Sequence, residues 1–475
     1  MTNDINNHDL FISSLENDSI IFPNEKIIPW INERRKECYT KIGFKELDDL
    51  KDWEFQRERY SLSHKSGRFF SIEGISVQTS WGFIQHWDQP IINQPEIGIL
   101  GLLAKKFNNI VHFLVQAKIE PGNINIVQIS PTLQATKSNY SRVHGGSSPK
   151  YLEFFRGRKD NKVIIDQLHS EQGSRFLQKR NRNIIVAIEE NEIINLDKNF
   201  IWLTLGQLKK LLEKDNVINM DTRSIISCIN FDGSYEKNLK IIENKKFLKN
   251  QNYFMAVSAL NTSININNFS VLTSWLTEMK SDFDLKIYQK SLKDLKLWHF
   301  QSGKLERKDK KYFSVIGVNV LIENREVISW DQPMIKPSED GVIIFLVTKF
   351  KGIYHFLAQA KLEAGNLDKF EIGPTIQCKQ SQYENKEYDD TIPFLKLLRK
   401  AKKKDYLFDS FQSEEGGRFF QEINRHIIVE IDKNEIDFMP KEFIWISLNQ
   451  LLSLNKYNNH LNISSRSLLS IIRYS

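Results

Sequence analysis

The residues best suited to chemistry lie on one face of a strand-like segment. In residues 111–120, apolar side chains alternate with polar ones that include His112, Gln116, Lys118 and Glu120. Because successive side chains of a β-strand point to opposite faces, one face packs on a core and the other carries groups that bind oxygen atoms and transfer protons. The next segment alternates similarly, with Gln128, Ser130, Thr132, Gln134 and Thr136 at its polar positions. We predict that the two polar faces form the floor of a cleft; a solvent-exposed sheet face is the alternative.

Both segments occur twice in the chain. His112–Asn123 returns as His355–Asn366, and the same offset of 243 residues joins the Trp-Asp-Gln-Pro sequences that begin at Trp87 and Trp330. A constant offset over this span predicts two copies of one module, each with its own core, because a solenoid repeat is only about 20–50 residues long. The polar positions of the second copy include Gln359, Lys361, Glu363 and Gln377.

A third repeated motif combines acids, glycine and arginine. It reads SEQGSRF at 170–176 and SEEGGRF at 413–419. A glycine after polar residues is typical of a loop that turns a carboxylate and backbone N–H groups towards a ligand, but the same residues also suit the N-terminus of a helix. The sequence leaves these two alternatives open.

Strands with short helices between them would have to position these groups. The patterns predict strands through most of each module and helices near residues 149–157 and 205–213. We therefore predict an α+β fold with mixed sheets and flanking helices. The expected units are an N-terminal arm and helix at 1–52, with 1–28 as a loose arm, a first module at 53–228, a connector at 229–297 that is helical from 276, and a second module at 298–475.

Composition narrows the class of protein. The 475 residues carry a net charge of +7, but the basic residues are scattered among 59 acidic ones, which argues against nucleic-acid binding. Three cysteines without a paired spacing argue against a disulfide framework or a structural zinc site. The first residues lack the apolar core of a signal peptide, and no apolar run approaches a membrane span. We expect a cytoplasmic protein without membrane contact.

Several longer sequences resemble the NDP-hexose 2,3-dehydratases. They are QAKIEPGN at 116–123, QISPTLQATKSNY at 128–140, SEQGSRF at 170–176, KRNRN at 179–183, EIGPTIQC at 371–378 and SEEGGRFF at 413–420. The resemblance covers the chain from Trp53 onward. It implies two tandem Nudix-like modules in a homodimer, without the metal-binding Nudix box. It also implies a lyase that removes water across C2 and C3 of a nucleotide-linked, usually dTDP-linked, 4-keto-6-deoxyhexose. No cofactor is implied, and the 3,4-diketo-2,6-dideoxy product would pass to a separate 3-ketoreductase in deoxysugar biosynthesis.

The implied reaction assigns roles to the polar residues. It needs a base for the C3 proton, a donor for the O4 oxyanion and an acid for the departing C2 hydroxyl. The candidate bases are Glu120, Glu171, His144 and Tyr140, which the sequence does not rank, and Lys118 is a further catalytic candidate. The expected substrate-binding residues are Trp53, Trp81, Gln116, Gln128, Thr132, Gln134, Thr136, Lys137, Ser138, Asn139, Arg142, Gln172, Lys179, Arg180, Asn181 and Arg182.

The two copies differ in charge after the paired strands. The first copy has Lys137, Arg142, His144, Lys179 and Arg180 where the second has Gln380, Asn385, Glu387, Glu422 and Ile423. Because pyrophosphate favours arginine and lysine donors, we expect the main site in the first module. Alanine at Arg180 and Arg182 should then abolish turnover, and alanine at Arg418 should weaken it less; freely varying surface charges are the alternative. A second-module pocket, whether degenerate, regulatory or only a wall, would contain Trp298, Gln359, Lys361, Glu363, Gln377, Glu414, Glu415 and Arg418.

Other functions stay open beside the lyase. A non-catalytic nucleotide-sugar-binding protein would bind the sugar without changing it. A metal-dependent Nudix hydrolase would release a nucleoside monophosphate, and a nucleic-acid binder would show a steep salt dependence. The nucleotide base, the final deoxysugar and its destination are also open.

Overall fold

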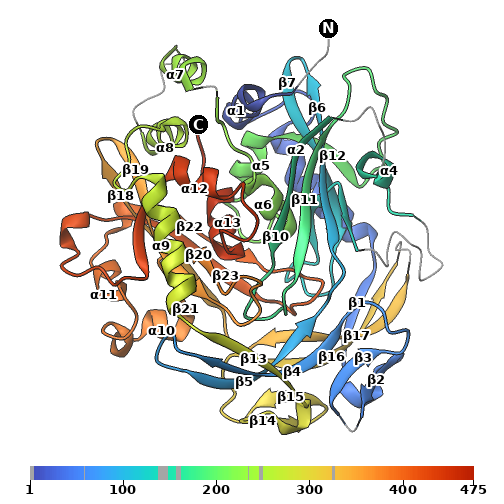
Figure 1. The fold of residues 1–475 in the computed structure, drawn as a ribbon. Helices are drawn as coiled ribbons and strands as arrows, with labels where there is room; N and C mark the ends of the chain where they lie inside the picture. The colour runs from blue at the N-terminus through green and yellow to red at the C-terminus, as the bar shows by residue number, and fades with distance from the viewer. Residues whose placement is uncertain are drawn as a thin grey trace.

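The fold consists of two large sheets side by side with two smaller sheets beneath them (Figure 1). The structure is a computed structural model that describes residues 5–57, 59–136, 148–156, 162–233, 235–244, 250–323 and 327–475. The predicted α+β class with mixed sheets is confirmed, whereas the Nudix-like label and the module boundaries stay predictions. Within the described ranges, no helix combines the length and apolar character that crossing a membrane requires.

The first half of the chain begins with two helices and continues mainly as strands. Its elements are α1 (Asn7–Leu15), α2 (Asn24–Glu37), β1 (Thr40–Lys45), β2 (Trp53–Gln56), β3 (Ser61–His64), β4 (Ser71–Thr79), β5 (His86–Asn93), β6 (Gly98–Phe107), β7 (Ile110–Ile119), β8 (Val127–Pro131), β9 (Leu133–Ala135), α4 (Leu152–Phe155), β10 (Lys162–Ser170), β11 (Arg180–Ala187), β12 (Phe200–Thr204), α5 (Leu205–Leu211) and α6 (Met220–Ser227).

The second half repeats this order after a helical connector. The connector holds α7 (Tyr235–Asn244), α8 (Gln251–Leu260) and α9 (Phe269–Asp282). The remaining elements are β13 (Leu285–Lys290), β14 (Trp298–Gln301), β15 (Lys304–Arg307), β16 (Phe313–Ile322), β17 (Ser329–Pro337), β18 (Gly341–Phe350), β19 (Ile353–Leu362), β20 (Phe370–Gly373), β21 (Ile376–Lys379), α10 (Gln380–Glu384), α11 (Leu395–Leu398), β22 (Tyr406–Ser413), β23 (Ile423–Glu430), β24 (Phe443–Ser447), α12 (Leu448–Leu454) and α13 (Ile463–Ser470).

The two large sheets have the same topology. In the first, the order is β10-β11-β6-β7-β12, with β8 beside β7 and β9 beside β6; in the second it is β22-β23-β18-β19, with β20 and β24 on β19 and β21 on β18. One pair in each sheet is parallel, β6 with β11 and β18 with β23, and the other pairs are antiparallel. The strand that carries the predicted polar row, β7, therefore lies inside a sheet rather than at its edge.

The two small sheets exchange a strand. β1 precedes the first module but pairs with β16, so that Phe44 lies opposite Val318, and β13 pairs with β4, so that Ile287 lies opposite Val77. Two matching indole hydrogen bonds also join the two halves: Trp53 Nε1 donates to Asp331 O at 2.7 Å and Trp298 Nε1 donates to Asp88 O at 2.8 Å. The halves are therefore interlocked through their backbones.

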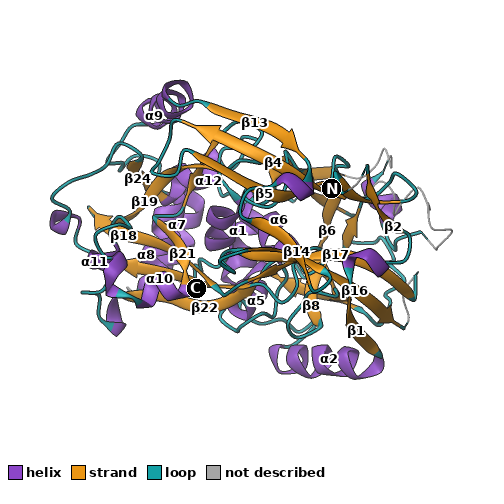
Figure 2. Ribbon diagram, turned by 90° about the horizontal axis from the view of Figure 1, so that it is seen from below, coloured by secondary structure: helices purple, strands orange, loops and turns teal. Residues whose placement is uncertain are grey.

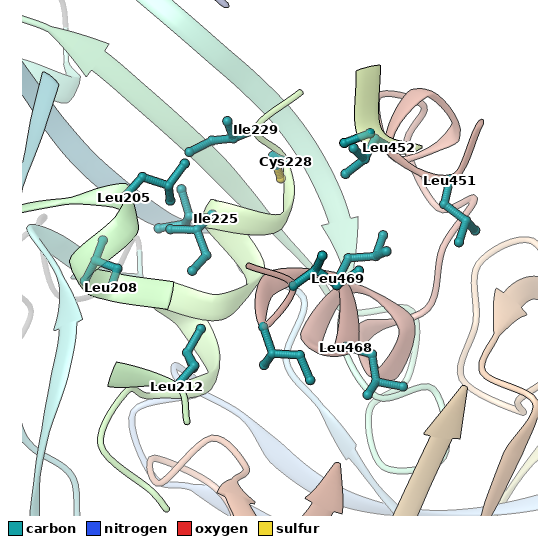
Figure 3. Close-up of a cluster of buried hydrophobic side chains, with 14 of the residues drawn as sticks. Leu205, Leu208, Leu212, Ile225, Cys228, Ile229, Leu451, Leu452, Leu468 and Leu469 are labelled. Atoms are coloured by element: carbon teal, nitrogen blue, oxygen red, sulfur yellow. The ribbon is translucent and has the colours of Figure 1, made fainter. Parts of the chain in front are cut away.

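The main core also joins both halves. Figure 3 shows the side chains of α5 and α6 near those of α12 and α13, among them Leu208, Ile225, Leu452 and Leu469. One buried cluster contains these residues together with strand residues of both large sheets. Each module also has a smaller buried cluster of its own, around Leu114 and Trp202 in the first and around Leu357 and Trp445 in the second. The expected separate cores are therefore present beside a main core that the two modules share.

Two segment predictions are also corrected. The expected loose arm is wrong for the described residues 5–28: α1 is capped by the Asn6 side chain and buries Phe11 completely. Ser13 Oγ of the same helix donates to Val111 O on β7 at 2.7 Å, and Figure 1 shows α1 beside β7. The helix expected from 276 ends at Asp282, after which β13 begins. Local periodicity could not predict β13, because its partner strand lies more than 200 residues earlier in the chain.

Candidate active site

A cavity of about 790 Å³ opens between the first large sheet, α2 and the small sheet of the second half. This volume is within the usual range of ligand pockets. The first half contributes Gln116, Lys118, Glu120, Gln134, Thr136, Lys179 and Asn181 to its lining. The second half contributes Trp330, Gln332, Glu415, Gly417 and Arg418. Figure 2 shows α2 beside β1 and β16 at this side of the molecule.

The predicted polar row of β7 forms one wall of the cavity. Gln116, Lys118 and Glu120 all line it, as strand alternation requires. Gln134 on the nearby β9 donates from Nε2 to Glu120 Oε1 at 2.7 Å. The second oxygen, Glu120 Oε2, is buried without a hydrogen-bond partner among the residues that the structure describes. A buried carboxylate oxygen of this kind is costly unless a ligand or water satisfies it.

A close approach of two glycine loops brings the second half into the cavity. Gly122 N donates to Gly416 O at 2.7 Å, and a Cβ atom on Gly122 would lie 1.7 Å from Phe419 O. Only glycine permits this distance. The loop that follows Gly416 then reaches the first module's cavity with Gly417 and Arg418.

Glu415 and Arg418 were expected in a second-module pocket that would be degenerate, regulatory or only a wall of the first site. Both line the first module's cavity. The Arg418 guanidinium lies 4.1 Å from the centroid of the Phe70 ring, and its Nε donates to Gln94 Oε1 at 3.2 Å. The internal repeat shows which loop contains these residues, but only the folded chain shows that the loop reaches the other module.

Sequence reasoning missed one acid, Asp221. It lies in the first turn of α6, is 4% exposed and lines the cavity. Burial raises its pKa well above the usual range, and the charges of Glu415, Glu120 and Glu171 add to this, opposed by Lys118. The sequence signal that could have identified Asp221 is a difference between the two copies, because the second copy has Ser464 at the corresponding position.

Glu415 is also a perturbed acid. Burial raises its pKa to about 8; Arg418 opposes this, whereas Glu171 and Glu120 add to it. A Cβ atom built on Gly417 would lie 3.1 Å from Glu415 Oε1 and 3.6 Å from Glu120 Oε1. Two carboxylates that come from different modules therefore lie close to the backbone of Gly417.

Glu171 lies behind the cavity wall rather than on it. Its Oε1 accepts a 2.7 Å hydrogen bond from Asn181 Nδ2, and Asn181 Oδ1 accepts from Gly98 N at 3.0 Å. Burial raises the pKa of Glu171 and lowers that of Lys179, and the attraction between their charges opposes both shifts. Lys179 and Asn181 line the cavity as predicted, whereas Glu171 does not.

Arg180 and Arg182 are not among the cavity-lining residues. Arg182 pairs instead with Asp166 on the neighbouring strand, its Nη2 lying 2.5 Å from Asp166 Oδ2. The second copy has the same pair between Arg425 and Asp409. An ion pair present in both copies indicates a structural contact, so the prediction that these arginines bind pyrophosphate loses its geometric support.

Three further predicted binding residues contact the other module instead of lining the cavity. Gln128 Nε2 donates to Ser413 Oγ at 2.6 Å, and Gln172 Nε2 donates to Glu414. The Trp81 ring packs edge-on against Phe370, with ring centroids 5.8 Å apart. Thr132 reaches the lining, but its hydroxyl already accepts from Leu103 N and donates to Leu114 O, and Thr375 makes matching contacts.

The remaining predicted residues divide into three groups. Trp53 lines the cavity, its ring packed beside Phe70. Lys361 and Glu363 of the second copy are outside this cavity; burial lowers the pKa of Lys361 and raises that of Glu363. Trp298, Gln359, Gln377 and Glu414 do not line it either. Lys137, Ser138, Asn139, Tyr140, Arg142 and His144 lie outside the described residues, directly after the lining residue Thr136.

Cations that sequence reasoning also missed lie elsewhere on the cavity lining. Arg34 of α2, Lys150 and Lys198 are part of it. Lys198 Nζ lies 2.8 Å from Glu37 Oε2, which also pairs with Arg34 Nη1 at 2.8 Å, and Lys150 pairs with Asp197. These side chains could bind the phosphates of a ligand whose other end reaches Glu120 and Glu415.

Comparison with known proteins identifies the family of this chain. The family model described as NDP-hexose 2,3-dehydratase matches residues 24–229 and 270–472. A protein of Saccharopolyspora spinosa named dTDP-4-dehydro-6-deoxy-alpha-D-glucopyranose 2,3-dehydratase is 39% identical over 95% of this chain and 91% of its own length. Proteins of the same name from Amycolatopsis orientalis and Streptomyces violaceoruber are 37% and 35% identical, over 97% and 94% of this chain and 92% and 96% of their own lengths. The chain therefore belongs to the NDP-hexose 2,3-dehydratase family.

Proposed function

We propose that this chain removes water across C2 and C3 of a dTDP-linked 4-keto-6-deoxyhexose, in the cavity between the two modules. The observation that carries the proposal is Glu120 Oε2, which is buried without a hydrogen-bond partner in the described part of the chain and lies beside Lys118 in a cavity large enough for a nucleotide sugar. The shared name of the three relatives supports the same substrate.

The first step uses the acidity of the proton next to the ketone. Glu120 takes the C3 proton, and the C3–H electron pair forms the C3=C4 bond of an enolate. Lys118, two residues earlier on the same strand face, stabilises the O4 oxyanion. Oriented donors and cations typically lower such a barrier by about 3–4 kcal/mol, and a positioned base contributes about 10²–10⁴-fold. Among the described candidate bases, Glu120 fits this role better than Glu171, because Glu171 does not line the cavity.

The second step expels the C2 hydroxyl. The enolate electrons form a C2=C3 bond while the C2–O bond breaks, and water leaves after the hydroxyl gains a proton. The resulting C3 enol then takes a proton at C2, releases the proton on O3 and becomes the 3,4-diketo-2,6-dideoxy sugar. This product is an electrophilic diketone, so we propose that a separate 3-ketoreductase consumes it.

The diphosphate is proposed to bind through the cations of the cavity lining. Arg34, Lys150 and Lys198 are better candidates for this contact than Arg180 and Arg182, which are not lining residues. We also propose the homodimer that the family resemblance implies; light scattering at micromolar concentration tests it, and a monomer would contradict it.

The experiment is turnover in D₂O with dTDP-4-keto-6-deoxyglucose, with a chelator and then with Mg²⁺. A 3-ketoreductase and NADPH trap the diketone, and mass spectrometry reads the products. We expect loss of one water with deuterium gained at C2, unaffected by the chelator. Binding without any change in the sugar would instead indicate a nucleotide-sugar-binding protein, and Mg²⁺-dependent release of nucleoside monophosphate would indicate a hydrolase.

A further inference from the structure

We propose that Asp221 and Glu415 form an acid pair that shares one proton and delivers it to the C2 hydroxyl as that group leaves. This inference rests on the proposed dehydration and names the groups that carry out its second step. The shared proton passes to O2, the C2–O2 electron pair leaves with the oxygen, and water departs. The proton that Glu120 takes from C3 balances the one that the pair releases.

The position of the two acids supports a role separate from that of Glu120. Asp221 comes from α6 of the first module and Glu415 from the crossing loop of the second, and both line the cavity that contains Glu120. Glu120 Oε1 and Glu415 Oε1 lie 3.6 and 3.1 Å from the point where a side chain at Gly417 would begin. These distances place the two carboxylate oxygens no more than 6.7 Å apart, so a sugar ring bound beside them would have both within reach.

The second copy keeps the residues proposed for the first step but not those proposed for the second. The second copy keeps the enolisation groups, as Lys361 and Glu363. It lacks both members of the acid pair, because Ser464 replaces Asp221 and Gln172 replaces Glu415. It also has Ser174 at the position of Gly417. All three first-cavity positions line the same cavity, so these differences between the copies point to chemistry that only this cavity performs.

A structural explanation of the acids is weaker. Asp221 could serve α6 by interacting with the helix dipole. However, α6 is already capped by Asn219, and the matching helix α13 is capped by Asn462 and has Ser464 where α6 has the acid. Glu415 interacts with Arg418, yet the matching Arg175 packs on Phe313 without an acid at the position of Glu415. The fold therefore tolerates the absence of both carboxyls.

The surrounding charges favour a protonated pair. The groups that act on the two carboxyls are the anions of Glu120 and Glu171 and the cations of Lys118, Lys179 and Arg418. Burial and the two anions raise the pKa of both carboxyls, that of Glu415 to about 8. The charge of Glu415 is itself one of the causes that raise the pKa of Asp221, because like charges disfavour the ionisation of both carboxyls.

The test uses Asp221→Ser and Glu415→Gln, which introduce the residues that the second copy has at these positions, with Ser464→Ala as the matched control. Each protein is given the natural substrate and a 2-deoxy-2-fluoro analogue, from which fluoride leaves without a proton. Water loss from the natural substrate should fall by about 10²–10⁴-fold in the two variants. Elimination of fluoride and exchange of the C3 proton with D₂O should stay within a few-fold of the unsubstituted enzyme, and Ser464→Ala should behave as that enzyme does.

Two further readouts keep the test decisive. In the unsubstituted enzyme, water loss should decline as the pH rises above about 8, and fluoride loss should not. Equal loss of both eliminations in the variants, or full retention of water loss, would overturn the acid pair. A failure of the unsubstituted enzyme to release water would instead overturn the proposed function. Thermal unfolding checks folding, and Asp221→Asn replaces Asp221→Ser if the serine variant does not fold.

Discussion

Replacing Arg418 by alanine should reduce catalysis far more than replacing its internal counterpart, Arg175. Each guanidinium group lies over a phenylalanine ring, that of Arg418 at 4.1 Å from the Phe70 centroid and that of Arg175 at 4.2 Å from the Phe313 centroid. Only Arg418 lines the cavity. A hydrogen bond from a buried charge contributes about 1.5–3 kcal/mol, so its loss should lower kcat/KM by about 10- to 100-fold.

Comparing Arg418→Ala with Arg175→Ala separates an effect on catalysis from an effect on stability. Both variants lose a cation–π contact worth about 0.5–2 kcal/mol, so both should lower the thermal midpoint, and Arg418→Ala also loses the hydrogen bond to Gln94. Initial rates of diketone formation, measured through the coupled ketoreductase, should stay within a few-fold of normal in Arg175→Ala. Equal losses of kcat/KM in the two variants would refute the reasoning, because they would show that the difference between the two positions does not matter.

Three further predictions follow from buried groups. Glu120→Gln should abolish both water loss and C3-proton exchange in D₂O, read by NMR, and retained exchange would exclude Glu120 as the base. Arg223 is fully buried and donates at 2.9 Å to Ser467 Oγ and at 2.6 Å to Ser413 O. Arg223→Met should therefore lower the unfolding free energy by about 3–5 kcal/mol in urea titrations. A loss below about 1 kcal/mol would contradict this. Burial, with the Arg223 charge, lowers the pKa of His426 to about 3. Above about pH 6.5 the neutral His426 therefore does not reduce the unfolding free energy. As the pH drops from about 6.5 towards 3, the unfolding free energy falls, by about 2 kcal/mol at pH 5, because only the unfolded chain takes up the proton. Urea titrations of His426→Gln should show a smaller fall.

The sequence predicted those parts of the site that depend on local geometry. Strand alternation is a property of neighbouring residues, so the placement of Gln116, Lys118 and Glu120 on one face followed directly. Gln134 followed for the same reason from the next segment. The alternation also predicted a core-facing side of each strand, and Phe113 and Val115 are fully buried.

The contacts between the modules could not be predicted in the same way. Because the two copies have similar sequences, β1 suits β16 as well as β4, and no local pattern states which pairing forms. The same ambiguity left open whether Arg418 would line a pocket of its own module or a wall of the first module's site, although the motif that contains it was recognised. Arg182 shows the converse error: its charge suggested a ligand, whereas Asp166 on the neighbouring strand already neutralises it.

The claim that the hexose binds between the modules is tested most directly by a crystal structure with dTDP-6-deoxyglucose. This analogue has a hydroxyl at C4 instead of the ketone, so it cannot form the enolate. We expect its C3 beside Glu120, its C2 hydroxyl beside Glu415 and Asp221, and its diphosphate against Arg34 or Lys198. A hexose bound beside Lys361 and Glu363 of the second copy, with the cavity between the modules empty, would contradict the account.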